Sequence, residues 1–226
     1  MFSYIIDNPN KFEIKDDYFI IPFGVRCTSA IACKYANIRK FSLPFDWSIP
    51  LFPKKIKNVL ENNFDNFVPD VHNGIFYNIY NFYVTHFNPD INTGIEEYKR
   101  RINRFNDIIN QSKKIYFVYI NEDYLYDVEY RQDQFNDNIF NDFLELEKYI
   151  KDRYKNIDYN ILYFNFKKNT IPIDSNIINI ILQTSTIYDI LHEAPFEEFR
   201  KFCGKILSEL FNTTLISSYT EDIFYN

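Results

Sequence analysis

Glycine is scarce in this chain, with four residues among 226. Nucleotide-binding loops need glycines at fixed spacing so that the backbone can approach a phosphate group. Neither the GxGxxG nor the GxxxxGKS/T pattern occurs, and the HExxH and GxSxG motifs of zinc proteases and serine hydrolases are also absent. The sequence therefore disfavours nucleotide-driven chemistry, and it predicts neither a cofactor nor a metal ion.

Cysteine is also rare and follows no paired spacing. The three residues are Cys27, Cys33 and Cys203, and no C-x-x-C motif occurs. An odd number argues against a complete disulfide framework, and the missing spacing argues against a structural zinc site. Free thiols in a reducing compartment fit this pattern better.

A basic excess and long apolar runs are missing as well. Lys and Arg number 25 against 31 Asp and Glu, which gives a net charge of −6. A phosphate backbone therefore finds no dominant electrostatic partner, and nucleic-acid binding is not expected. No run approaches the length of a membrane span, and the N-terminus lacks the pattern of a signal peptide. We therefore expect a cytoplasmic protein with no nucleic-acid or membrane partner.

Helical and extended patterns alternate along the chain. Residues 18–23 predict a strand whose Pro22 marks a sheet edge or a strand end, and residues 28–36 predict a short helix. The proline-rich residues 41–53 predict a structured loop. Further strands are expected within residues 74–86 and at 115–120, 159–166 and 176–182, and further helices at 54–63, 94–111, 136–154 and 195–210.

This alternation predicts parallel strand pairing, because a helix between two strands carries the chain back to the same edge of a sheet. We therefore expect an α/β fold: a single layered domain over residues 1–226, with a mixed, largely parallel sheet flanked by helices. No internal repeat, linker or domain boundary is evident.

Cys27 is the most informative single residue. A strand that ends near Gly24 and a helix that starts near Thr28 would place this thiol at a helix N-terminus. The positive potential there, together with Arg26, would lower a thiol pKa from its usual value of about 8.5. The N–H groups of Cys27 and Thr28 could then hold an oxyanion during acyl transfer. The alternative is a small apolar residue packed beneath the sheet.

A cysteine nucleophile needs a base, and the chain has three histidines, His72, His86 and His192. His86 is the best candidate, because the end of a strand would hold it rigidly at a sheet edge, where the active sites of α/β folds gather. The alternative is a hydrogen-bonded imidazole at the surface.

Several residues compete for the remaining roles. Asp46, between Phe45 and Trp47, could orient His86, or it could bond to the backbone of its own loop. Asn88 and Asp90 compete with it. Arg100 and Arg104 share a helix face and could grip a carboxylate or phosphate, or form a solvated face. The remaining expected binding residues are Arg26 and Trp47.

Several blocks together resemble a known family. FGVRC, SLPFDW, the aromatic strand that ends in His86 and the segment RINRFNDIINQSKKIYFVY are similar to the DUF1796 family of papain-like cysteine peptidases, found in bacteria and large DNA viruses. The similarity extends from about residue 18 to about residue 120. It implies that Cys27 is the nucleophile and His86 the base, with Asp46 in the most characteristic block. It also implies an α+β papain-like fold as an alternative to the α/β arrangement.

The chain departs from the family pattern at two positions. Phe23 stands where the family usually has leucine, and Phe87 follows the histidine where such proteins often have aspartate. The third catalytic member therefore stays open between Asp46, Asn88 and Asp90.

The predicted function is that of a cysteine hydrolase, a peptidase or a related acyl-transfer enzyme. Its substrate would be a peptide, an isopeptide or another acyl compound, and a host protein in the host cytoplasm would be a further partner if the chain is viral. An SGNH-like esterase is a second prediction, prompted by Asp189 and His192 at DxxH spacing. A non-catalytic interaction protein on the same scaffold is the third.

Overall fold

The computed structural model describes most of the chain, and the fold below refers to that part. The described residues are 2–7, 9–24, 26–49, 52–68, 70–72, 75–77, 80, 83–84, 87–111, 113–122, 139–184 and 193–216.

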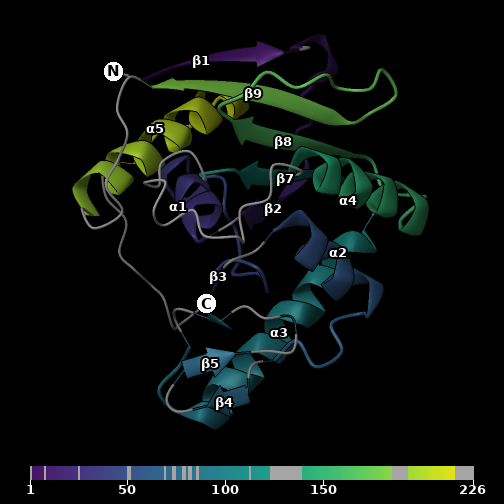
Figure 1. The fold of residues 1–226 in the computed structure, drawn as a ribbon, viewed down its shortest axis with the longest axis vertical. Helices are drawn as coiled ribbons and strands as arrows, with labels where there is room; N and C mark the ends of the chain where they lie inside the picture. Colours follow the sequence, from purple (N-terminus) through teal and green to yellow (C-terminus); the bar gives the residue numbers. More distant parts are fainter. Residues whose placement is uncertain are drawn as a thin grey trace.

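A five-stranded sheet forms the centre of the molecule (Figure 1). Its order is β1-β9-β8-β7-β2, in which β2, β7, β8 and β9 are parallel and β1 pairs antiparallel with β9. The predicted α/β class with a mixed, largely parallel sheet is confirmed, and the α+β alternative is not the arrangement observed. The strands are β1 (Phe2–Asp7), β2 (Tyr18–Gly24), β7 (Lys114–Ile120), β8 (Tyr159–Asn165) and β9 (Ile177–Thr184).

The position of β2 explains why it tolerates a proline. Pro22 has no backbone N–H to donate, and β2 lies at the end of the strand order, where one side of the strand needs no partner. Of the two predicted positions, a sheet edge or a strand end, the sheet edge is observed. The opposite edge is β1, an antiparallel strand that the sequence patterns do not predict. It is followed by the short 3₁₀ helix η1 (Pro9–Lys11).

Helices cover both faces of this sheet. Alternate residues of β2 point to different layers: Phe23 belongs to a core that includes residues of α2, α3 and α4, whereas Ile20 packs with residues of α1 and α5. Strands buried on both faces are the reason that β7 and β8 read as continuous apolar runs. The helices are α1 (Thr28–Tyr35), α2 (Pro53–Glu61), α3 (Ile91–Ile109), α4 (Ile139–Arg153) and α5 (Glu193–Phe211).

The helices α1 and α5 pack closely because of one glycine. A Cβ atom at Gly204 would lie 2.6 Å from Cβ of Tyr35 and 3.1 Å from the carbonyl oxygen of Ala32. No larger residue fits there without moving the helix backbones apart. This contact fixes α5 against α1. It also helps to place Arg200, one turn before Gly204, near the N-terminus of α1.

A second, smaller sheet is antiparallel and has the order β3-β6-β5-β4. Its strands β4 and β5 lie beside α3, away from the main sheet (Figure 1). Ser48 of β3 pairs with Val84 of β6, so the chain after the PFDW block runs beside the chain that leads toward residue 85. The predicted turn at Asn73 and Gly74 lies outside the described residues. The strands are β3 (Ser48–Ile49), β4 (Asp70–His72), β5 (Ile75–Tyr77) and β6 (Tyr83–Val84).

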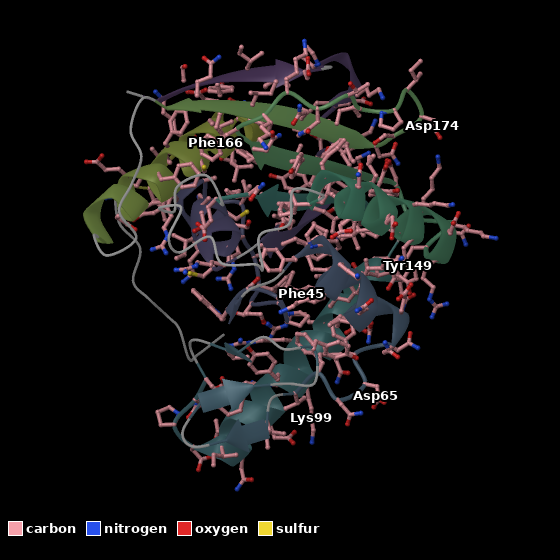
Figure 2. The ribbon with its side chains drawn as sticks, viewed as in Figure 1. Phe45, Asp65, Lys99, Tyr149, Phe166 and Asp174 are labelled. Carbon is pink, nitrogen blue, oxygen red and sulfur yellow. The ribbon has the colours of Figure 1, made fainter. Side chains whose placement is uncertain are left out.

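Aromatic side chains fill the layer between the main sheet and α3. Figure 2 shows Phe45 inside the molecule, whereas Asp65, Lys99 and Asp174 lie at its periphery. Within the described part of the chain, no helix is long and apolar enough to cross a membrane.

Candidate functional site

Cys27 lies at the N-terminus of α1, as the sequence predicts. It is the N-cap residue, and its carbonyl accepts the first bond of the helix from the Ile31 N–H at 2.9 Å. The turn from β2 is tight, since a Cβ atom at Gly24 would lie 2.4 Å from Oγ of Ser29. Ser29 Oγ in turn accepts a hydrogen bond from the Ile120 N–H at 3.0 Å. The thiol is therefore anchored at the carboxyl edge of β2 and β7, where α/β sheets bind ligands.

Glu122 is a functional candidate that the sequence reasoning missed. It follows β7 by two residues, and its side chain is completely buried. The Thr28 hydroxyl donates to its Oε2 at 2.5 Å, and Nε of Arg26 lies 3.7 Å from its Oε1. Its burial beside Thr28 makes this carboxylate a candidate, but a single glutamate carries no spacing that a sequence pattern could detect.

Arg200 is the second candidate that was missed. It comes from α5, and its Nη2 lies 3.7 Å from Sγ of Cys27. Its Nε donates to Oγ1 of Thr28 at 3.4 Å, and its Nη1 lies 3.8 Å from Oε2 of Glu197. The distance along the chain hid this residue, because 173 positions separate it from Cys27.

The pKa of Cys27 is raised, which corrects the expectation of a lowered value. The residue is 7% exposed, and burial is the largest influence because it disfavours the charged thiolate. Arg200 and Arg26 act in the opposite direction and lower the pKa, and Glu122 raises it further. Desolvation therefore outweighs the two cations, and the resting group is a neutral thiol.

Burial predicts a loss of stability at alkaline pH. The pKa values of Cys33 and Cys203 are raised above their ordinary value of 9.0, and burial raises that of Tyr98 above 10.0. Between the unfolded and folded pKa values, the unfolded chain has released protons that the folded chain keeps, so stability is complete below about pH 9 and falls above it. We expect the urea concentration at the unfolding midpoint to be lower at about pH 10.5 than at about pH 8. Cys33→Ala should flatten this decline, and a constant midpoint would contradict it.

The backbone N–H groups predicted to hold an oxyanion lie where the helix leaves amides available. The first amides of any helix have no intrahelical acceptor, and Cys27 and Thr28 occupy the N-cap and first positions of α1. Their place on the chain fits the predicted role, at the same edge of the sheet as the thiol.

Two roles were expected for Asp46, and the described contacts agree with the second, in which its carboxylate bonds to the backbone of its own loop. Its Oδ2 accepts a hydrogen bond from the Leu43 N–H at 2.9 Å and also bonds to the guanidinium of Arg39. The carboxylate and the guanidinium are both buried. The adjacent Trp47, a predicted binding residue, is 2% exposed and belongs to the core. The described contacts therefore give Asp46 a role in holding the PFDW loop.

Asp90 is the N-cap of α3. Its Oδ1 accepts a hydrogen bond from the Thr93 N–H at 2.8 Å, and hydrogen bonding from the side chain of Thr93, followed by this backbone bond, lowers the pKa of the exposed carboxyl. Asn88 Oδ1 accepts from the Asp90 N–H at 3.0 Å, and its amide donates to Oε1 of Glu97 at 3.2 Å.

The predicted base His86 lies outside the described residues, as do His192 and Asp189.

The predicted pair of arginines on α3 is divided between two environments. Arg104 donates to the Ser42 carbonyl at 3.0 Å and lies over the ring of Phe41. It therefore links α3 to the PFDW loop, the loop of residues 41–53 that contains the PFDW block. Burial is the largest cause that lowers its pKa, followed by the charges of Arg100 and Arg101. Arg100 is exposed.

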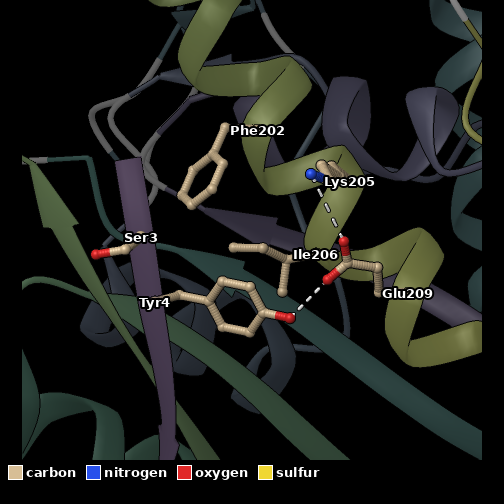
Figure 3. Close-up of a pocket in the computed structure, with 6 residues that line it drawn as sticks. All are labelled: Ser3, Tyr4, Phe202, Lys205, Ile206 and Glu209. Atoms are coloured by element: carbon tan, nitrogen blue, oxygen red, sulfur yellow. Dashed lines mark hydrogen bonds and ion pairs between the residues drawn. The ribbon is translucent and has the colours of Figure 1, made fainter. Parts of the chain in front are cut away.

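A pocket of about 260 Å³ lies between β1 and α5 (Figure 3). Tyr4 donates to Glu209 at 2.6 Å within it, and this bond is the main cause that raises the pKa of Tyr4 to about 12. Its lining includes none of the residues around Cys27. Among the residues that the structure describes, no group of three His, Cys, Asp or Glu side chains could hold a metal ion.

Comparison with known proteins leaves the family open. No protein-family model, curated protein or solved structure matches the chain at a significant level. The family expected from the sequence blocks therefore stays a prediction, and the contacts of Cys27 carry the functional argument.

Proposed function

We propose that this protein is a cysteine hydrolase or acyl-transfer enzyme in which Cys27 attacks the carbonyl carbon of a peptide, an isopeptide or another acyl compound. The carrying observation is the position of its Sγ: at the start of α1, at the carboxyl edge of parallel strands, 3.7 Å from a guanidinium. A nucleophile placed in this way has the amides of a helix N-terminus for an oxyanion and a nearby cation for a thiolate.

The raised pKa of Cys27 determines how the attack must proceed. The resting thiol is neutral, so a general base has to remove its proton while the bond between sulfur and carbon forms. The carbonyl oxygen becomes an oxyanion, which the N–H groups of Cys27 and Thr28 stabilise. The base then returns the proton to the leaving group as its bond to carbon breaks. Water completes hydrolysis by attacking the thioester and releasing the thiol.

We assign the base to His86. The family resemblance supports this assignment, and so does the pairing of Ser48 with Val84, because it brings the strand leading to His86 beside the PFDW block. Phe87, which follows the histidine, is buried against the ring of Tyr98 at 5.8 Å, and a Cβ atom at Gly94 would clash with it.

The proposal predicts that Cys27 reacts with iodoacetamide with help from His86. We expect His86→Ala to lower the alkylation rate of Cys27 at pH 7 by at least about tenfold, because general base assistance is lost. Mass-spectrometric fragment ions measure the rate, since Cys27 and Cys33 share a tryptic peptide. His192→Ala is the matched control and should leave the rate unchanged. A Cys27 that reacts no faster than Cys203 would overturn the proposal in favour of a non-catalytic binding protein.

The cysteines also support a location for this chemistry. All three are free thiols in the structure, and each is buried. We infer that the protein works in a reducing compartment such as the cytoplasm, where a cysteine nucleophile stays reduced.

A further inference from the structure

We propose that Arg200 is a further catalytic residue, the cation that stabilises the thiolate of Cys27, and that the carboxylate of Glu122, bonded to the same Thr28 hydroxyl, acts against it. This inference rests on the proposed function, since it names the group that supports the same nucleophile. The chain of contacts runs from Sγ of Cys27 to Nη2 of Arg200, from Nε to the Thr28 hydroxyl, and from that hydroxyl to Glu122.

The orientation of the guanidinium is the first argument. Each of its three nitrogens has a separate partner: Nη2 the thiol, Nε the Thr28 hydroxyl, and Nη1 Glu197 at 3.8 Å. Glu197 is itself held, because the Tyr35 hydroxyl donates to it. A guanidinium whose three nitrogens are held in this way is preorganised to face the thiol, whereas the flexible side chain of a lysine would not be.

The charge distribution is the second argument. Within the described part of the chain, the charged groups that act on Cys27 are Arg26 from the turn before α1, Glu122 from the end of β7, and Arg200 from α5. Arg200 Nη2 lies 3.7 Å from the thiol, whereas Nε of Arg26 lies 3.7 Å from Oε1 of Glu122. When the thiol loses its proton, Arg200 is the group placed to receive the new negative charge, through a hydrogen bond that strengthens as the charge develops.

Glu122 and Arg200 should therefore affect the thiol in opposite directions. Removing the cation makes the thiolate harder to form, whereas removing the buried carboxylate makes it easier. A purely structural network predicts no such opposition, because both losses would simply loosen the contact between α1 and α5.

The test is the alkylation rate of Cys27 as a function of pH in the full chain, measured with iodoacetamide because this reagent is neutral. For Arg200→Gln we expect the midpoint of the profile to move to higher pH and the rate at pH 7 to fall by about threefold to tenfold. For Glu122→Gln we expect the midpoint to move to lower pH. Arg200→Lys, which keeps the charge, should lie between Arg200→Gln and the unaltered protein.

Lys201→Gln is the matched control, since it removes one positive charge from the next position of α5, where the side chain is exposed over the ring of Tyr35. It should leave the profile unchanged, and circular dichroism should show that every variant is folded. A reactive Cys27 whose midpoint ignores Arg200, or moves the same way in both variants, would overturn this inference alone. A Cys27 inert in the unaltered protein would overturn the proposed function as well.

Discussion

Asp46→Asn should destabilise the protein by about 3 to 5 kcal/mol, because it leaves the guanidinium of Arg39 buried without a counter-charge. Both side chains of this ion pair are excluded from solvent, and Oδ2 of Asp46 also holds the Leu43 N–H at 2.9 Å. Urea unfolding followed by circular dichroism measures the loss. If Asp46 were instead the orienting member of a catalytic triad, the main effect would be on the reactivity of Cys27.

Two further variants separate the ion pair from other effects of the substitution. Asp90→Asn is the matched control, since asparagine is also a good N-cap at this exposed position and should cost no more than about 0.5 kcal/mol. The double variant Arg39→Met with Asp46→Leu removes both charges and should be more stable than Asp46→Asn. A loss below about 1 kcal/mol for Asp46→Asn would show that the pair is unimportant.

Phe45→Ala should cost about 3 to 5 kcal/mol, because it opens a cavity at the centre of an aromatic cluster. The ring is 1% exposed and lies 5.2 Å from the ring of Phe23, which extends from β2, and 5.9 Å from that of Phe105 in α3. Two more rings, Phe64 and Phe67, lie 5.5 and 5.6 Å away. The variant therefore removes contacts with three separate segments, and its urea unfolding curve should shift accordingly.

Phe41→Ala is the control within the same loop. Its ring is 41% exposed, so the change should stay within about 0.5 kcal/mol. Phe45→Leu should be intermediate, because leucine fills part of the cavity. Equal effects at positions 41 and 45 would contradict the view that Phe45 carries the packing of the PFDW block.

Local patterns predicted much of the fold. The strand that became β2 and the helix that became α1 matched within two residues, because a short apolar run and a short helix directly after it are decided by neighbours in the sequence. The first strand escaped prediction because its pairing with β9 supplies most of its order, and Ile5 on it is 51% exposed. A strand that depends on a distant partner leaves a weak local signature.

The candidate site was predictable in part for the same reason. The position of Cys27 follows from the local order of strand, turn and helix, whereas Arg200 and Glu122 reach it through tertiary packing. The expectation of a lowered thiol pKa was wrong, because the sequence shows the neighbouring cation but not how deeply the thiol is buried. Asp46 was ambiguous because its partner Arg39 lies seven positions earlier, in a loop without periodicity.

The 173 positions between Cys27 and Arg200 have a consequence for biosynthesis. A ribosome adds about 5 to 20 residues each second, so the thiol emerges roughly 10 to 35 seconds before its guanidinium partner exists. Contacts of such sequence separation also form late, because loop closure must precede them. During that interval Cys27 has neither its burial nor its cation, and the nascent chain depends on the reductants around it to keep the sulfur from oxidation.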